Sequence, residues 1–509
     1  MTPRVQWAAS RSGAAGRPSS DEEPGSAAAI WFDLTTSMVW LGGVTGIVRA
    51  ELELGKHLAL RDARVRFCGL RGGEFVEISR AKLEWLFSAD NVIDAYLAER
   101  EELRGEWLSP VARKSDVQLI LEELDEFPFG WLDRLRSAVV FLVSLLPAAV
   151  AERVLAVLLA LSAPFGTWRE PAPVRRATTA PAEYSKTVSG PVESPFRPGD
   201  TFVSVGWMDT GKEPYLASLK RTVPGLRIVY CIYDTILLNE STSMLYAPAS
   251  TGKFAAYFSW ICRNADLILC GGENTRADVA HATARLELPQ PRLAAIRFGA
   301  EPVRSRAMHA ESFGYRPDDD TVLRLLRVAR PFVLCVGTIE ARKNHQILYK
   351  AWALLSQAGE REVPLLVIAG SNYGMEDFLD TLHRDPRLRD RYLILQPNDY
   401  QLRVLYDHAA FTLLPSLYEG WSLTLPESLS YGKFCLAADV APLREVGGDL
   451  VDYLDPFDAA AWASRVVHYT RDVEALRARE RRIRATWRPS TWEDSATLVS
   501  AALRGHLDA

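Results

Sequence analysis

Residues 332–344 read FVLCVGTIEARKN, and this stretch decides the fold class. Its continuous apolar run, Phe332–Val336, ends at Gly337, and a helix is predicted over Asn344–Ser356. A strand without polar alternation is typical of a parallel sheet that is covered on both faces. The stretch therefore predicts an α/β domain.

The same alternation of strands and helices extends through most of the chain. Further strands of the C-terminal half are predicted at Leu365–Ala369, Tyr392–Leu395, Phe411–Leu414, Phe434–Ala437 and Leu450–Tyr453, with a helix at Gln401–His408 and a helical tail from Asp458. In the N-terminal half, strands are predicted at Ile30–Leu34, Val65–Cys68, Phe75–Ile78, Phe202–Val205, Ile228–Ile232 and Leu267–Cys270, and helices at Ile47–Leu60, Glu213–Thr222, Lys253–Asn264 and Thr275–Ala284. The expected architecture is two doubly wound, Rossmann-like domains that face a cleft, with ligands at the carboxyl ends of the strands.

Changes in composition set the domain boundaries. We place the N-terminal domain at residues 30–310, the C-terminal domain at 311–485 and a last helical segment at 486–509. Residues 1–29 are rich in Ala, Ser, Gly and Pro and lack the apolar block of a signal peptide, so we expect a disordered lead-in. Residues 91–200 break the strand–helix rhythm and predict a helical and loop insertion in the N-terminal domain.

The insertion contains the most apolar segment of the chain, Val139–Ala163. Pro147 and the pair Glu152-Arg153 interrupt it, so neither half reaches the ~20 residues that span a bilayer. Two short helices could form a hairpin that packs on the domain. Alternatively, residues 131–163 could contact the membrane surface, where Arg side chains suit anionic headgroups.

Composition excludes several classes of protein. The 509 residues carry a net charge of −5, which argues against a broadly basic nucleic-acid binder but not against binding of one phosphorylated ligand. None of the six cysteines lies in a C-x-x-C pair, and the eight histidines include no H-E-x-x-H. We therefore expect buried reduced thiols, no metal site and no cofactor.

Two Gly-containing turns are candidate anion sites. Gly42-Gly43 and Gly46 lie between a predicted strand and a helix, where free backbone N–H groups can receive an anion. This loop is neither G-x-G-x-x-G nor a P-loop with its Lys. Arg342-Lys343 follows Gly337 at the start of a helix, where cations are unfavourable unless they face an anion such as a diphosphate. An exposed basic turn is the alternative interpretation.

The segment Ser416–Leu429, SLYEGWSLTLPESL, supplies two carboxylates, Glu419 in a loop and Glu427 in the following helix. A loop carboxylate beside backbone amides can bind sugar hydroxyls. A carboxylate one turn into a helix can accept hydrogen bonds from ribose hydroxyls. The spacing by itself carries no information, because chance supplies many such pairs in a chain of this length.

With its flanks, this segment is more informative. Residues 416–458, SLYEGWSLTLPESLSYGKFCLAADVAPLREVGGDLVDYLDPFD, and 336–345, VGTIEARKNH, resemble the GT4 family of retaining glycosyltransferases that use nucleotide-sugars. GGVTGIVRAE at 42–51 and FRPGDTFVSVGW at 196–207 are similar to a bacterial polysaccharide branch of mannosyl- and rhamnosyltransferases. The resemblance implies a GT-B fold, in which the C-terminal domain binds the nucleotide-sugar and the N-terminal domain binds the acceptor. It also implies that the last helix crosses back to the N-terminal domain.

The resemblance assigns roles to individual residues. Arg342 and Lys343 would neutralise the leaving diphosphate in place of a metal, and Glu419 would contact the donor sugar. Further donor contacts would come from Gly43, Gly46, Gly337, Thr338, Gly420, Trp421, Ser422 and Leu423, with Pro397 near the base and Glu427 on the ribose. Tyr233 and Asp234 would lie on the acceptor side.

Three positions depart from the family pattern. Many members have Arg where this chain has Thr338, a His-Asp pair is common where Tyr233-Asp234 stands, and Ser422 replaces a Gly. Trp207, Trp421 and Trp492 could stack on sugars, although we expect Trp492 to pack against the N-terminal domain. The mechanism implied is front-face attack through an oxocarbenium-like state, in which the leaving phosphate deprotonates the acceptor.

The expected function is that of a metal-independent, retaining glycosyltransferase of cell-surface polysaccharide synthesis. It would move a hexose or deoxyhexose from a GDP-, UDP- or dTDP-linked donor to a glycan or lipid-linked glycan. We expect a cytoplasmic protein, or one bound peripherally to the inner face of the membrane. A sugar-nucleotide epimerase and a non-catalytic nucleotide-sugar-binding scaffold are the alternatives.

Overall fold

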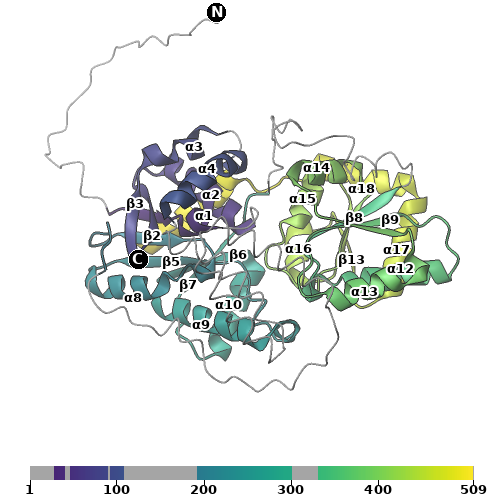
Figure 1. Ribbon diagram of the computed structural model, residues 1–509, viewed down its shortest axis with the longest axis horizontal. Helices are drawn as coiled ribbons and strands as arrows, with labels where there is room; N and C mark the ends of the chain where they lie inside the picture. Colours follow the sequence, from purple (N-terminus) through teal and green to yellow (C-terminus); the bar gives the residue numbers. More distant parts are fainter. Residues whose placement is uncertain (1–27, 41–45, 90–91, 108–191, 301–330, 508–509) are drawn as a thin grey trace, which may run out of the picture.

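The computed structural model describes residues 28–40, 46–89, 92–107, 192–300 and 331–507. Within these ranges the chain forms two α/β domains, each built on one sheet (Figure 1). Gly43, residues 131–163 and almost all of the predicted lead-in lie outside them.

The N-terminal sheet has seven strands in the order β3-β2-β1-β4-β5-β6-β7. The strands are β1 Ile30–Asp33, β2 Val65–Arg71, β3 Glu74–Ile78, β4 Thr201–Ser204, β5 Arg227–Ile232, β6 Leu267–Gly271 and β7 Arg292–Ile296. The helices are α1 Thr35–Val39, α2 Gly46–Arg61, α3 Glu84–Ser88, α4 Val92–Trp107, α8 Glu213–Thr222, α9 Pro248–Asn264 and α10 Glu273–Arg285. Only the pair β2–β3 is antiparallel.

The C-terminal sheet has six parallel strands in the order β10-β9-β8-β11-β12-β13. The strands are β8 Phe332–Val336, β9 Leu365–Ala369, β10 Tyr392–Leu395, β11 Thr412–Leu414, β12 Cys435–Ala438 and β13 Asp452–Leu454. The helices are α12 His345–Gln357, α13 Glu376–Arg384, α14 Asp399–His408, α15 Thr424–Ser430, α16 Ala441–Gly447, α17 Ala459–Arg471 and α18 Val473–Thr486. The chain then returns to the N-terminal domain as α19, Trp492–Leu507.

This topology confirms the expected GT-B architecture of two Rossmann-like domains. The continuous apolar run of β8 has the predicted physical cause, because this strand supplies two cores. Val333 and Cys335 of β8 belong to the core on one face of the sheet, and Phe332 and Leu334 belong to the core on the other face. A polar side chain at any of these positions would lie in an apolar core.

The first part of the predicted insertion packs into the core of the N-terminal domain. Residues 92–107 form α4, and Val92, Ile93, Tyr96 and Trp107 are buried in the core of the N-terminal domain. The indole of Trp107 lies so close to Gly69 of β2 that a β-carbon there would be 2.9 Å from it. Because charged residues separate these apolar positions in the sequence, the apolar pattern did not predict a core helix here. The rest of the insertion, residues 108–191, lies outside the described residues.

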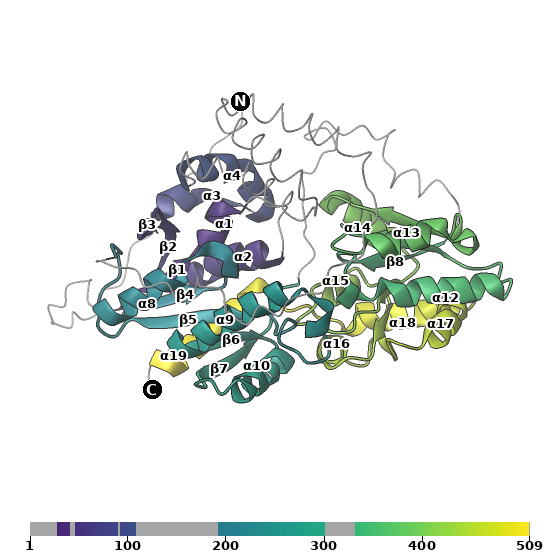
Figure 2. The same cartoon turned by 60° about the horizontal axis from the view of Figure 1, so that its bottom comes forward.

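The last helix ties the two domains together. α19 packs against α2 and β7, as Figure 2 shows for the yellow helix among the elements of the N-terminal domain. Trp492 is buried between Phe298, whose ring centroid is 6.4 Å away, and the Arg49 guanidinium, 5.7 Å from the indole. Trp492 is thus a packing residue, as expected.

Two other features concern the whole described part of the chain. All six cysteines are buried and free. Among the helices in the described ranges, none combines the length and the apolar character that a membrane crossing requires.

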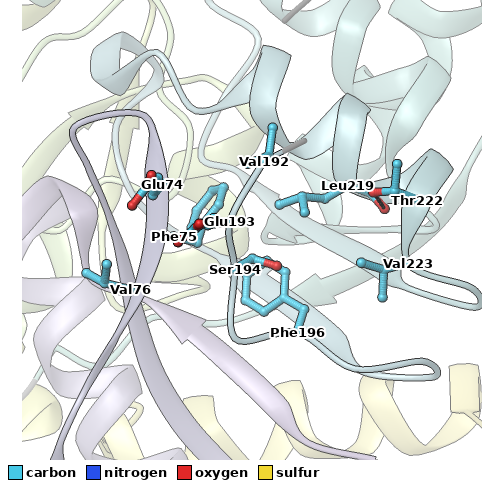
Figure 3. Close-up of a pocket in the computed structure, with 10 residues that line it drawn as sticks. All are labelled: Glu74, Phe75, Val76, Val192, Glu193, Ser194, Phe196, Leu219, Thr222 and Val223. Carbon is cyan, nitrogen blue, oxygen red and sulfur yellow. Dashed lines mark hydrogen bonds between the residues drawn. The ribbon is translucent and has the colours of Figure 1, made fainter. Parts of the chain in front are cut away.

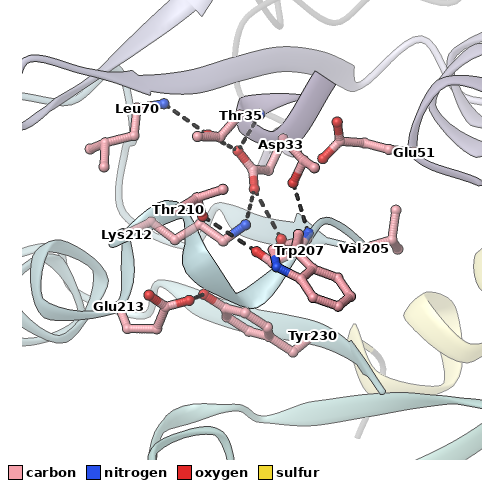
Figure 4. Close-up of polar contacts among 12 residues, drawn as sticks. Asp33, Thr35, Glu51, Leu70, Val205, Trp207, Thr210, Lys212, Glu213 and Tyr230 are labelled. Carbon is pink, nitrogen blue, oxygen red and sulfur yellow. Dashed lines mark hydrogen bonds and ion pairs between the residues drawn. The ribbon is translucent and has the colours of Figure 1, made fainter. Parts of the chain in front are cut away.

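A cluster of buried charges lies where β1 and β4 end, at the point where the strand order of the N-terminal sheet reverses (Figure 4). Asp33 Oδ2 is 2.7 Å from Lys212 Nζ, and neither side chain is exposed. Ser204 also donates to Asp33, and the Ser37 backbone N–H donates to Glu51 Oε2 at 2.6 Å. The cluster joins α1, α2 and both strands into one rigid unit.

We predict that Glu51→Gln makes the protein less sensitive to pH. Burial, reinforced by Asp33, raises the pKa of Glu51 from 4.5 to about 7. The folded state therefore keeps a proton that the unfolded chain loses, so the stabilisation is complete below about pH 4.5 and is lost as the pH rises toward 7. Relative to that of the wild type, the free energy of unfolding of the variant should rise by on the order of 2 kcal/mol between pH 5 and pH 8.

Urea unfolding at several pH values measures this gain. Glu77→Gln on β3, whose side chain is 47% exposed, is the matched control and should show no such trend. If the free energies of unfolding of Glu51→Gln and the wild type differ by a constant amount from pH 5 to pH 8, Glu51 is ionised throughout and the prediction is wrong.

Candidate active site

The carboxyl edges of the two sheets meet at the domain boundary. Gly420, in the loop after β11, lies against Asp234 and the carbonyl of Tyr233, so closely that a β-carbon would be 2.8 Å from Asp234 Cβ. Glu445 of α16 accepts from the backbone N–H groups of Glu273 and Asn274, at 2.8 and 2.9 Å. A carboxylate at the N-terminus of a helix, here α10, is favoured by the helix dipole.

The centre of this boundary is an ion-pair cluster formed by the loops that follow β8 and β11. Arg342 Nη1 donates to Glu419 Oε2 at 2.9 Å, and Lys343 Nζ donates to Glu419 Oε1 at 2.6 Å. The strand order reverses between β8 and β11, which is where doubly wound sheets bind ligands. Glu419 is 5% exposed and Arg342 is 9% exposed, so this is not the exposed basic turn of the alternative interpretation.

Backbone geometry holds the two loops in register. Asn344 adopts a left-handed conformation, with φ of 54°, that ends the turn after β8. Its side-chain amide donates to the carbonyls of Pro415 and Pro456, at 3.1 and 2.8 Å. The Leu417 backbone N–H donates to the Arg342 carbonyl at 2.8 Å.

The two cations have different surroundings. Arg342 also donates to the Tyr418 carbonyl at 2.8 Å, to Glu340 at 2.6 Å and to the hydroxyl of Tyr246 at 3.1 Å. Tyr246 belongs to the N-terminal domain, so Arg342 spans the boundary. Lys343 has three ammonium protons, one of which is directed to Glu419. Lys343 is therefore better able to take up a ligand anion, and Arg342 mainly organises the site.

The electrostatics keep Glu419 charged. Burial alone would raise its pKa, but Arg342 and then Lys343 lower it to about 2. The pKa of Asp234 is raised by burial, although its carboxylate accepts from the Ile236 backbone N–H at 3.0 Å. The site thus contains one fixed carboxylate and, across the boundary, a second that binds a proton more readily than an exposed Asp.

Two glycines allow the turns after β8 and β9 to pack closely together beside Lys343. Gly337, with φ of 144°, ends β8, and Gly370 follows β9. A β-carbon at Gly370 would collide with the carbonyl of Gly337, and one at Gly337 would lie 3.5 Å from Lys343 Cε. Sequence reasoning missed Gly370, although it ends an apolar strand as Gly337 does. Thr338 is half-buried next to this pair.

The start of α2 reaches the loop after β11. A β-carbon at Gly46 would be 2.9 Å from Leu423 Cδ1, so the structure brings together two predicted donor-side residues from different domains. Ser422 has φ of 55°, where a non-Gly residue costs roughly 1–2 kcal/mol. The departure from the family Gly therefore falls at a position whose conformation favours Gly.

Two predicted donor-binding residues, Glu427 and Pro397, lie outside the ion-pair cluster. Glu427, half-buried in α15, accepts from the Tyr406 hydroxyl at 3.4 Å, and the Tyr406 ring stacks on Tyr431 at 4.8 Å. Pro397 follows β10 at the same carboxyl edge as Gly337. Their contacts with base and ribose stay predictions.

The side chains of Trp421 and Tyr233 pack within the N-terminal domain, and their roles toward donor and acceptor stay predictions. The Trp421 indole is 9% exposed and belongs to the hydrophobic core of the N-terminal domain. The Tyr233 hydroxyl donates to the Val205 carbonyl at 2.6 Å, and its ring stacks on Phe298 at 5.0 Å. Both side chains thus join structural elements to one another. The sequence could not reveal this, because their partners come from distant segments.

Several cavities lie away from the ion-pair cluster. One of ≈ 490 Å³ lies beside β3 and α8, lined by residues such as Phe75, Phe196 and Leu219 (Figure 3). It adjoins the edge strand β3, at the opposite end of the sheet from β6 and β7. No cationic side chain of the described residues lines it. A smaller cavity, of ≈ 300 Å³, is lined by Thr235, Asp278 and His281. No group of three or more metal-binding side chains occurs in the described ranges.

We predict that Arg342→Ala and Lys343→Ala have unequal effects on stability. Removing Arg342 leaves Glu340 without its partner guanidinium and leaves Glu419 paired with Lys343 alone. This should lower the free energy of unfolding by about 3–5 kcal/mol. Removing Lys343 leaves the Arg342–Glu419 pair intact and should cost about 1 kcal/mol. Urea unfolding measures both, with Lys350→Ala on the exposed face of α12 as the control. Equal costs for the two variants would contradict the separation of their roles.

Parts of the chain are similar in sequence to known glycosyltransferases. Residues 324–485 match the family described as glycosyl transferases group 1. The O-antigen chain mannosyltransferase B of Escherichia coli is 29% identical over 167 residues, 33% of this chain and 44% of that protein. The serotype-specific mannosyltransferase WbdA of Escherichia coli is 24% identical over 253 residues, 48% of this chain and 30% of that protein.

The chain therefore spans less than half the length of these curated relatives. Among solved structures, an alpha,alpha-trehalose 6-phosphate synthase from Burkholderia multivorans has a TM-score of 0.46 and 14% identity, covering 61% of this chain and 72% of that one. The part of this chain that carries Arg342, Lys343 and Glu419 is thus similar to the group 1 glycosyl transferases.

Proposed function

We propose that this chain is a retaining, metal-independent glycosyltransferase of cell-surface polysaccharide synthesis. It transfers a hexose or deoxyhexose from a nucleotide-sugar to a glycan or lipid-linked glycan. The observation that carries the proposal is the position of Lys343 and Arg342 beside Gly337, where the strand order of the C-terminal sheet reverses.

The donor diphosphate binds at this point. Gly337 lies beside the Lys343 side chain, so that a β-carbon there would be 3.8 Å from Lys343 Nζ, and a phosphate held by this lysine can approach the backbone of the turn after β8. As the bond to the sugar breaks, negative charge grows on the phosphate, and a fixed cation stabilises that charge without any rearrangement of solvent. Lys343, supported by Arg342, does the work that a metal ion does in other transferases.

Glu419 acts on the sugar. Its low pKa keeps it a carboxylate, which accepts hydrogen bonds from sugar hydroxyls and stabilises positive charge on the ring. Asp234 faces it across the boundary and contacts the acceptor hydroxyl. The leaving phosphate takes the hydroxyl proton as the acceptor attacks from the same face, so the anomeric configuration is retained.

The relatives suggest the donor. Both curated matches are named mannosyltransferases, so GDP-mannose is the first donor to test, followed by UDP-glucose and dTDP-rhamnose. Pro397 then lies near the base and Glu427 near the ribose. An epimerase would need further free acid and base groups, whereas Glu419 and Glu340 are both held by Arg342.

We predict that a cognate nucleotide-sugar raises the thermal midpoint of the wild type and that Lys343→Ala abolishes this shift. A ligand at 100 times its Kd stabilises a protein by about 2.7 kcal/mol. Lys343→Ala should also lower turnover at least ~10²-fold, as expected for loss of a group that stabilises transition-state charge. Lys350→Ala is again the control.

Three results would contradict this prediction. They are unchanged turnover in Lys343→Ala, no shift with any donor, and transfer with inversion when the product anomer is assigned by NMR. Turnover that a chelator removes and Mg²⁺ restores would overturn metal independence alone.

Peripheral membrane contact is a separate proposal, based on the sequence of residues 131–163. We expect the full chain to sediment with vesicles that contain anionic lipid. A chain without residues 131–163 should stay in the supernatant, and 1 M salt should weaken binding of the full chain because it screens surface charge. Equal sedimentation of both chains, or no sedimentation of either, would refute the contact.

A further inference from the structure

The loop after β4 lies beside the candidate acceptor position. β4 and β5 are neighbouring parallel strands, and the Tyr233 hydroxyl after β5 donates to the Val205 carbonyl after β4. Neighbouring strands are about 4.8 Å apart, so the segments that follow β4 and β5, which contain Trp207 and Asp234, adjoin at the same sheet edge. A molecule that presents a hydroxyl group at Asp234 can therefore extend over Trp207.

Trp207 is exposed, yet its position is fixed. The residue is 37% exposed, while its backbone N–H donates to Thr36 Oγ1 at 2.7 Å. At Gly206, Thr36 and Glu51 leave no room for a β-carbon, so the loop is in close contact with the domain. The Trp40 ring stands edge-on to Trp207, with centroids 6.4 Å apart and planes at 73°.

The buried charge cluster lies directly behind this loop (Figure 4). The segment that begins at Trp207 ends at Lys212, which is fully buried on Asp33. Glu51 is fully buried, and its Oε1 atom, which faces Gly206, has no hydrogen-bond partner among the residues that the structure describes. Lys212 thus closes the reversal point of the N-terminal sheet, so a ligand of this domain must bind next to that point.

We propose that Trp207 is the platform of an acceptor subsite, on which the second sugar of an oligosaccharide stacks while the terminal sugar lies at Asp234. A pyranose ring offers one face of C–H groups, and the rigid indole can cover that face with little loss of conformational entropy. The inference rests on the proposed function and specifies its acceptor as a saccharide of at least two sugars.

The test uses mannose, mannobiose and mannotriose as probes, because the curated relatives are mannosyltransferases. Binding to the full chain in the presence of GDP is measured by calorimetry. In the wild type, affinity should rise from mannose to mannobiose. Trp207→Ala should lose this gain, about tenfold, and Trp207→Phe should keep most of it.

Two controls locate the effect. Leu60→Ala removes an exposed apolar side chain, 57% exposed, at the far end of α2 and should bind as the wild type does. His281→Ala alters the separate cavity that Thr235 and Asp278 also line, and should likewise leave the gain intact. Folding of each variant is checked by its thermal midpoint.

The proposal is overturned if Trp207→Ala keeps the gain, if the wild type gains nothing from the second sugar, or if His281→Ala alone removes it. These failures differ from failure of the proposed function, in which no nucleotide-sugar shifts the thermal midpoint of the wild type. A donor shift without any dependence of saccharide binding on Trp207 rejects the subsite and leaves the transferase.

Discussion

The buried pair Arg342–Glu419 is the interaction on which the rest of the site depends. It joins the loops after β8 and β11, which are distant in sequence, and it fixes the charge of the carboxylate. The same guanidinium reaches Tyr246 in the N-terminal domain. One side chain therefore sets the position of Glu419, the direction of Lys343 and part of the contact between domains. A Lys in its place could not make these contacts, because only a planar guanidinium offers five donors in a fixed fork.

The backbone architecture was readable from the sequence because its cause is local. The strands β8, β9 and β10 of the C-terminal sheet are uninterrupted apolar runs, and each of them supplies the cores on both faces. The missed elements lacked that signal. In β7, Arg292–Ile296, most residues are partly exposed, and in α4 charged residues separate the buried ones. The left-handed conformation of Ser422 was also outside the reach of pattern reasoning.

The residues of the candidate site were also predictable only where the cause of their position is local in sequence. Arg342, Lys343 and Glu419 follow predicted strands, so their meeting at one sheet edge follows from topology. Trp421 and Tyr233 are adjacent in sequence to site residues, yet their side chains pack elsewhere, because the partner of each lies in a distant segment. Tyr246 and Glu445 carry no motif, and only the docking of the two domains makes them part of the site.

Both sheets place an ion pair at the point where the strand order reverses, and the difference between the pairs separates the roles of the domains. In the N-terminal domain Lys212 fills that point, fully buried on Asp33, so the protein supplies its own cation and leaves no charge for a ligand. In the C-terminal domain the Lys343 side chain is 13% exposed and shares Glu419 with Arg342. In the proposed function, a diphosphate that binds there competes with Glu419 for the ammonium, and Arg342 keeps the carboxylate charged while Lys343 turns to the phosphate. That function uses two cations because one holds Glu419 while the other meets the leaving group. On this proposal the anionic donor binds to the C-terminal domain, and the N-terminal domain recognises a neutral acceptor by its shape.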